Sequence, residues 1–161
     1  MSKIGWVGIG VMGRSMCGHL LAAGHEIRVH TRTKASAASV LEAGAVWCDR
    51  AGDVAEGSDF VFTIVGYPSD VRAVYLGEGG LVEKAAPGTV LVDMTTSEPA
   101  LAVEIHAAAA ARGLAALDAP VSGGDLGARN AALAIMVGGE AGPFERTMPL
   151  FERMGKNIRL M

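Results

Sequence analysis

Aromatic residues and charge of one sign are both scarce in this chain. Only 5% of its 161 residues are aromatic, and the formal net charge is −3. Nucleic-acid binding needs the opposite, because clustered lysine and arginine neutralise phosphates and aromatic rings stack on unpaired bases. We therefore expect no nucleic-acid partner. Charged residues make up 19% and apolar residues 50% of the chain, a composition that excludes intrinsic disorder as well.

Cysteine is equally scarce, with only Cys17 and Cys48 and no CxxC pair. A disulfide framework needs more cysteines, and structural zinc needs cysteine and histidine ligands at short spacings. None of the four histidines, His19, His25, His30 and His106, stands at a ligand-type spacing from either cysteine. We expect a cytoplasmic protein with neither disulfides nor a metal site.

Long apolar runs are absent too. A membrane-spanning helix needs about 20 apolar residues, whereas Arg14, Glu26 and Arg28 interrupt the most apolar part of the chain. We expect no membrane contact. A chain of 161 residues can form one compact domain with its own core. No internal repeat, low-complexity linker or block of like charge marks a second domain.

Short apolar runs alternate with longer helical patterns along the whole sequence. Strands are predicted at Ile4–Val7, Ile27–His30, Ala45–Trp47, Phe60–Val65, Val90–Asp93, Ala115–Asp118, Ala134–Val137 and Ile158–Leu160. Helices are predicted at Val11–Ala23, Ala35–Ala43, Asp53–Gly57, Pro68–Tyr75, Pro99–Arg112 and Pro143–Met154. This alternation predicts an α/β fold, a doubly wound and mainly parallel sheet with helices on both faces.

The most informative segment is the glycine-rich run Gly8-Ile9-Gly10-Val11-Met12-Gly13. It follows the first predicted strand and opens the first predicted helix, as in dinucleotide-binding Rossmann units. We expect Gly8 to make the tight turn, Gly10 to let the backbone approach a pyrophosphate, and Gly13 to let helix and strand pack closely. Free N–H groups at the helix start then hold the phosphates. The alternative is a tight strand-to-helix turn that binds no ligand.

The end of the second predicted strand distinguishes NAD from NADP. An Asp or Glu there accepts hydrogen bonds from the ribose hydroxyls of NAD and repels the extra phosphate of NADP. Here Thr31 stands where the acid is expected, and Arg32, Thr33 and Lys34 follow. We expect Arg32 to bind the 2′-phosphate, helped by Thr31, Thr33 or Lys34, which favours NADP. The alternative is that Arg32 and Lys34 belong to a solvated loop.

The GxGxMGxxM pattern, completed by Met16, resembles the β-hydroxyacid dehydrogenase family. That family includes 3-hydroxyisobutyrate dehydrogenase and the cofactor domain of 6-phosphogluconate dehydrogenase. Two further family patterns follow in the same order, VDMTTS at Val92–Ser97 and LDAPVSGG at Leu117–Gly124. The resemblance covers the whole chain. It implies an NAD(P)-dependent oxidoreductase that transfers hydride to or from a small 3-hydroxy acid or a related aldehyde or keto acid.

The resemblance also implies ligand contacts beyond the glycine-rich run. The expected cofactor-binding set is Gly8, Ile9, Gly10, Val11, Met12, Gly13, Thr31, Arg32, Thr33, Lys34, Val65, Gly66, Tyr67, Val71 and Thr96. The loop Ser122-Gly123-Gly124 is expected to hold the substrate carboxylate and hydroxyl, because adjacent glycines expose N–H donors. An alternative for Thr96 is a cap of the helix predicted from Pro99.

One family element has no counterpart in the sequence. The family's proton-transfer lysine lies in a GxxGxGxxxKxxxN-type segment, which would start beyond Met161 and lead into an all-α substrate and dimerisation domain. We therefore expect residues 1–161 to form one NAD(P)-binding domain of a homo-oligomeric enzyme, with no catalytic residue of its own. This domain would bind cofactor without turnover. The alternative is a nucleotide-binding or sensing module that never catalysed a redox reaction.

Overall fold

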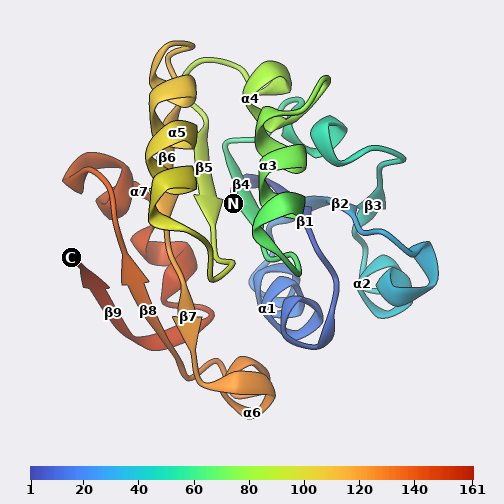
Figure 1. Ribbon diagram of the computed structural model, residues 1–161. Helices are drawn as coiled ribbons and strands as arrows, with labels where there is room; N and C mark the ends of the chain where they lie inside the picture. Colours follow the sequence, from blue (N-terminus) through green and yellow to red (C-terminus); the bar gives the residue numbers. More distant parts are fainter.

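The computed structural model describes residues 1–161 and contains a six-stranded parallel sheet. The spatial order is β3-β2-β1-β4-β5-β6, so the direction in which strands are added reverses at β1 (Figure 1). Every neighbouring pair is parallel. The strands are β1 (Lys3–Val7), β2 (Glu26–His30), β3 (Val46–Trp47), β4 (Phe60–Thr63), β5 (Val90–Asp93) and β6 (Ala115–Asp118).

A smaller sheet of three strands extends the fold beyond β6 (Figure 1). Its strands are β7 (Val121–Ser122), β8 (Leu133–Val137) and β9 (Gly155–Leu160). β7 pairs antiparallel with β8, and β9 pairs parallel with it. Asp118 and Gly138 connect the two sheets through an antiparallel bridge with N–H to carbonyl distances of 2.9 and 2.7 Å. This bridge ties the edge strand β6 to the smaller sheet.

Helices cover both faces of the main sheet (Figure 1). One face carries α1 (Val11–Ala22), α2 (Ala38–Glu42) and α7 (Ala141–Phe151), and the other carries α3 (Pro68–Leu76), α4 (Leu81–Lys84), α5 (Pro99–Ala110) and the 3-10 helix η2 (Ala51–Ala55). The remaining elements are the 3-10 helix η1 (Lys34–Ala37) and α6 (Gly124–Arg129). No helix combines the length and apolar character that crossing a bilayer requires.

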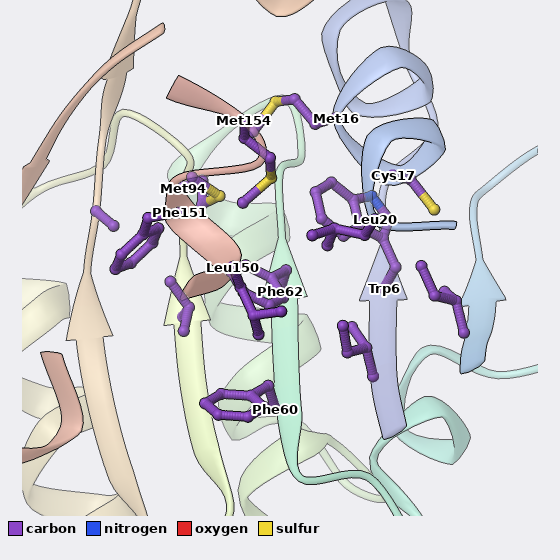
Figure 2. Packing of buried hydrophobic residues seen from close by; sticks show 14 of the residues in the cluster. Trp6, Met16, Cys17, Leu20, Phe60, Phe62, Met94, Leu150, Phe151 and Met154 are labelled. Atoms are coloured by element: carbon purple, nitrogen blue, oxygen red, sulfur yellow. The ribbon is translucent and has the colours of Figure 1, made fainter. Parts of the chain in front are cut away.

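The central strands β1, β4 and β5 are mainly apolar and almost wholly buried, because helices cover both faces of the sheet there. Along β4, Phe60 and Phe62 belong to the core beneath α1 and α7, whereas Val61 belongs to the core beneath α3, α4 and α5. Figure 2 shows the first of these cores from close by. Trp6 stacks on Phe62 with 5.5 Å between ring centroids, and Phe62 meets Phe151 of α7 edge-on at 6.3 Å. These rings anchor β1, from which the glycine-rich turn starts.

The predicted fold class is confirmed, and β5 and β6 have the predicted bounds. Two helix predictions are wrong in part. The range Ala35–Ala43 divides into η1 and α2, and Asp53–Gly57 is replaced by the 3-10 helix Ala51–Ala55. α4, β7 and α6 were not predicted. They contain two to six residues, too few for a hydrophobic period to show.

Candidate functional site

A cavity of about 670 Å³ opens where β1, β2 and β4 end. This is the position at which the strand order reverses, and open parallel sheets bind their ligands there. Its volume lies in the range of cofactor and small-molecule sites. The predicted cofactor residues that line it are Gly8, Ile9, Gly10, Val11, Met12, Gly13, Thr31, Arg32, Val65, Gly66 and Tyr67.

Gly8 makes the tight turn at the end of β1. Its φ is +105°, and an added Cβ would overlap the carbonyl of Ile64 beyond β4. The Gly8 N–H donates to the His30 carbonyl at 2.9 Å, and the indole N–H of Trp6 donates to the Gly8 carbonyl at 2.9 Å. Three strands therefore meet at this glycine, which has the conformation expected of the turn.

Gly10 stands at the N-cap of α1, on the cavity side. An added Cβ there would meet no atom within 4 Å, so the space before it is open. The first intrahelical bond runs from Arg14 N–H to the Gly10 carbonyl at 3.0 Å. The amides of Val11, Met12 and Gly13 come before this bond and have no acceptor within the helix. A cradle of free amides at the positive end of a helix dipole fits a pyrophosphate.

Gly13 lies one turn into α1 and is buried. An added Cβ would overlap the carbonyl of Gly8, so the helix crosses the turn at backbone contact. We expect Gly13→Ala to lower the free energy of unfolding by about 2 kcal/mol, the cost of overpacking. Urea denaturation measures this change. Gly18→Ala is the matched control, because an added Cβ at Gly18 meets nothing within 4 Å; equal stability of the two variants would contradict the prediction.

The residues after β2 divide into those that face the cavity and those that turn from it. Thr31 is almost fully buried, and its hydroxyl accepts the Ile9 N–H at 3.1 Å. Arg32 lines the cavity and pairs with Asp70 at 2.9 Å. Thr33 and Lys34 do not line it, and the Lys34 ammonium lies 5.5 Å from the centroid of the Trp47 ring. Thr31 thus braces the glycine-rich turn, and Arg32 is the basic group left at the cavity.

The turn after β4 forms the opposite wall. The Val65 N–H donates to the Thr95 hydroxyl at 3.0 Å, and the Tyr67 N–H donates to the Asp70 carboxylate at 3.1 Å. Tyr67 is 69% exposed and lines the cavity. Val71 is fully buried in the core beneath α3 and does not line the cavity. Val71, expected among the cofactor-binding residues, thus lies behind the cavity wall, and its contact with the cofactor stays a prediction.

A buried polar network fixes this turn from beneath. Asp93, the last residue of β5, accepts hydrogen bonds at one carboxylate oxygen from the Thr63 hydroxyl (2.9 Å) and the Thr95 N–H (3.0 Å). The Thr63 hydroxyl is also 2.7 Å from the hydroxyl of Tyr75 in α3. Burial raises the pKa of Asp93 to about 6, although hydrogen bonds from Thr95 and Thr63 oppose the shift. The network joins the ends of β4 and β5 to α3.

Thr96 lies in the exposed part of the loop that leaves β5, outside the cavity. The alternative that it caps the following helix is wrong, because α5 begins at Pro99 with Glu98 in the N-cap position and no side-chain cap. The neighbouring Ser97 hydroxyl is buried without a hydrogen-bond partner. Thr96 therefore stays available to a ligand at the sheet edge.

The loop Ser122-Gly123-Gly124 lies outside the cavity and is exposed. Gly123 and Gly124 have φ values of +135° and +61°, conformations that favour glycine. The following helix α6 packs against α1, where the His19 ring nitrogen lies 2.8 Å from the Ala128 carbonyl (Figure 1). The loop is thus held beside the helix whose start forms the phosphate cradle.

Sequence reasoning missed several cavity residues: Val7, His30, Ala51, Ile64, Asp70, Ala73 and Val74. Asp70 matters most among them because it is the one carboxylate of the lining. Its position in the first turn of the helix could be predicted from the local sequence. Asp70 is the third residue of a helix that opens with Pro68, and it forms a capping box with Tyr67. The contact of Asp70 with Arg32 could not be predicted from the sequence, because the two residues are 38 positions apart.

A second cavity of about 410 Å³ lies between α5 and the end of β6. Its acidic residues are Asp93, Asp118 and Glu140, and His106 and Tyr75 are its other ionisable residues. Burial raises the pKa of Asp118, which ends β6. No group of three or more His, Cys, Asp or Glu side chains stands close enough to hold a metal ion.

The fold and the glycine-rich cavity define a dinucleotide-binding domain. A family model described as the NAD binding domain of 6-phosphogluconate dehydrogenase matches residues 3–161, and the chain belongs to this family. The resemblance and the class of cofactor predicted from the motifs, NAD or NADP, are thereby confirmed.

Two curated relatives and one solved structure illustrate the similarity. The chain is 54% identical over 156 residues to the uncharacterized oxidoreductase YkwC of Bacillus subtilis, covering 97% of this chain and 54% of that protein. It is 40% identical over 158 residues to 3-hydroxyisobutyrate dehydrogenase of Pseudomonas aeruginosa, covering 98% and 53%. The structure of Mycobacterium tuberculosis 3-hydroxyisobutyrate dehydrogenase with L-serine superposes with a TM-score of 0.92 at 34% identity, covering 99% of this chain and 54% of that one. The chain spans about half the length of the relatives it matches.

Proposed function

We propose that this chain is the cofactor domain of a dehydrogenase or reductase that transfers hydride between a nicotinamide cofactor and a small 3-hydroxy acid or the related aldehyde or keto acid. The cradle of free amides at Gly10 carries the proposal, since it presents donors to a pyrophosphate where the strand order reverses. The bound cofactor would supply the hydride. The chain's own residues hold and orient it.

NADP is the favoured cofactor in this proposal. Arg32 is the one lysine or arginine among the cavity-lining residues, and Thr31 stands where an acid for NAD would be expected. A guanidinium recognises a phosphate with paired hydrogen bonds. Both Lys34 and Thr33 lie outside the cavity; Lys34 assists only through its positive charge, and Thr33 only after a change in the loop.

Arg32→Ala tests the cofactor preference. We expect the variant to bind NADPH about tenfold more weakly, because a charge-assisted contact is worth about 1.5–3 kcal/mol when well formed and less when exposed. NADH affinity should stay within about twofold. Isothermal titration calorimetry with both nucleotides measures these changes. The preference is refuted if the unmodified chain binds NADH ten times more tightly than NADPH.

The substrate side of the proposal rests on Ser122-Gly123-Gly124. The loop is exposed beside α6, and its glycine conformations leave a serine hydroxyl and backbone amides free for a carboxylate. The 3-hydroxyisobutyrate dehydrogenase relative supports a small hydroxy acid as the substrate class. We further propose a cytoplasmic, homo-oligomeric whole protein. Exposed apolar side chains at Val103, Met136 and Leu160 support the association.

Residues 1–161 are proposed to bind cofactor without turnover. The resemblance assigns proton transfer to a lysine, which must lie within hydrogen-bond reach of the reacting oxygen, and no lysine lines the cavity. Calorimetry should therefore show NADPH binding to this chain, while oxidation of NADPH with 2-hydroxy-3-oxopropionate or methylmalonate semialdehyde stays at the rate without protein. Turnover that scales with the concentration of the chain and survives repurification would contradict the proposal.

A further inference from the structure

An ion pair joins two walls of the proposed cofactor cavity. Arg32, beyond the end of β2, places a guanidinium nitrogen 2.9 Å from one carboxylate oxygen of Asp70 in the first turn of α3. The two residues come from opposite walls, and both line the cavity. The group that we propose to bind the 2′-phosphate is therefore paired with a carboxylate of the chain itself.

The two partners differ in mobility. The second oxygen of Asp70 accepts the Tyr67 N–H at 3.1 Å, and this bond closes the capping box of α3. An added Cβ at Gly66 would lie 3.4 Å from the same oxygen, so the carboxylate packs on the turn that it caps. The side chain of Asp70 is 23% exposed and that of Arg32 is 83% exposed. Arg32 is thus the partner that can swing away.

The charges of the residues that line the cavity make the Arg32–Asp70 pair important for the choice between NADP and NAD. Among the residues that line the cavity, Arg32 is the one Lys or Arg and Asp70 is the one carboxylate. The nearby Lys34 does not line the cavity and lies against the Trp47 ring instead. A 2′-phosphate must take Arg32 from Asp70 and then remain close to that carboxylate. A ribose hydroxyl meets no such conflict, since it can donate to a carboxylate and leave the pair intact.

We infer that Asp70 is a specificity-determining residue, which competes with the 2′-phosphate for Arg32 and thereby reduces the preference of the cavity for NADP over NAD. This inference rests on the proposed function, in which Arg32 binds the phosphate. It assigns to α3 a role that the end of β2 normally has in choosing between the two cofactors. An opposing charge placed against one ligand is a common means of achieving specificity.

Asp70→Asn tests the inference, because the amide oxygen of asparagine can still cap Tyr67 while the negative charge is removed. We expect the ratio of the NADH to the NADPH dissociation constant to rise about fivefold, as is typical for loss of one exposed ion pair. Glu104→Gln is the matched control. It removes the charge that pairs with Arg72, a residue of the same helix as Asp70, in an exposed ion pair away from the cavity. This variant should leave the ratio unchanged. Circular dichroism melting shows whether each variant folds.

Two further measurements separate this inference from the proposed function. Adenosine 2′,5′-bisphosphate and adenosine 5′-monophosphate probe the adenine end alone, and only the first should gain affinity from Asp70→Asn. In an Arg32→Ala background, Asp70→Asn should change the NADH to NADPH ratio by less than twofold. The inference is overturned if Asp70→Asn leaves the ratio unchanged while Arg32→Ala lowers it. If the unmodified chain binds neither dinucleotide, the proposed function fails instead.

Discussion

The Gly10→Val substitution should reduce NADPH affinity at least about a hundredfold and leave the fold intact. An added Cβ at Gly10 meets no protein atom within 4 Å, so the protein can accommodate the branched side chain. It then occupies the space in front of the free amides of α1, which a pyrophosphate needs at hydrogen-bond distance. The backbone at Gly10, with φ −92° and ψ −160°, is extended and therefore open to valine. Calorimetry measures the affinity, and urea denaturation should show a change in unfolding free energy of about 1 kcal/mol or less.

Gly18→Val is the matched control for this prediction. Gly18 belongs to the same helix and has equally open surroundings, but it does not line the cavity. This variant should bind NADPH as tightly as the unmodified chain. If Gly10→Val also keeps its affinity, the cofactor does not approach the start of α1 and the proposed site is wrong. If it unfolds the protein, the open space assigned to Gly10 is wrong.

The glycine-rich turn could be predicted from the sequence in large part. Two of its constraints act between residues close in sequence, in one strand-turn-helix unit: Gly13 crosses the Gly8 carbonyl, and Gly8 adopts the positive φ that the turn demands. Strands such as β5 were predictable for a similar reason, because a short apolar run, here Val90–Val92, between turn signals is enough to identify a strand buried on both faces.

The rest of the candidate site depends on contacts between segments distant in sequence. Thr31 was expected to help bind a phosphate, yet its hydroxyl accepts the N–H of Ile9, 22 positions earlier. Thr95 was given no role, although it holds the turn at Val65, 30 positions away. Arg32 was predicted to bind a phosphate or to lie in a solvated loop, and its pairing with Asp70 depends on where the start of α3 lies relative to the end of β2. Spacing along the chain contains no information on such pairs.

Asp93 is the clearest case of a role that only the fold defines. In the sequence it is the acid of VDMTTS, but in the structure it is buried and organises the turns that follow β4 and β5. One of its oxygens accepts both protein hydrogen bonds, from Thr63 and Thr95. The side chain also borders the second cavity, between α5 and β6. The hydrogen bonds need an acceptor oxygen at this place but do not need a negative charge.

Asp93→Asn should therefore stabilise the protein at neutral pH. Burial raises the pKa of Asp93 from 3.8 to about 6, so between these values the folded state binds more protons than the unfolded state. The free energy of unfolding then falls as the pH rises from about 4 to 6, by up to about 3 kcal/mol at 1.36 kcal/mol per pKa unit.

Asparagine keeps the acceptor oxygen and removes this cost, while its amide N–H groups can reach water in the second cavity. Urea denaturation at several pH values between 4 and 7 should give equal stabilities for the two proteins near pH 4 and a more stable variant at pH 7. Asp49→Asn, at an exposed carboxylate, should show no such divergence. A constant difference between Asp93→Asn and the unmodified protein across this pH range would mean that Asp93 is not the group whose ionisation opposes folding.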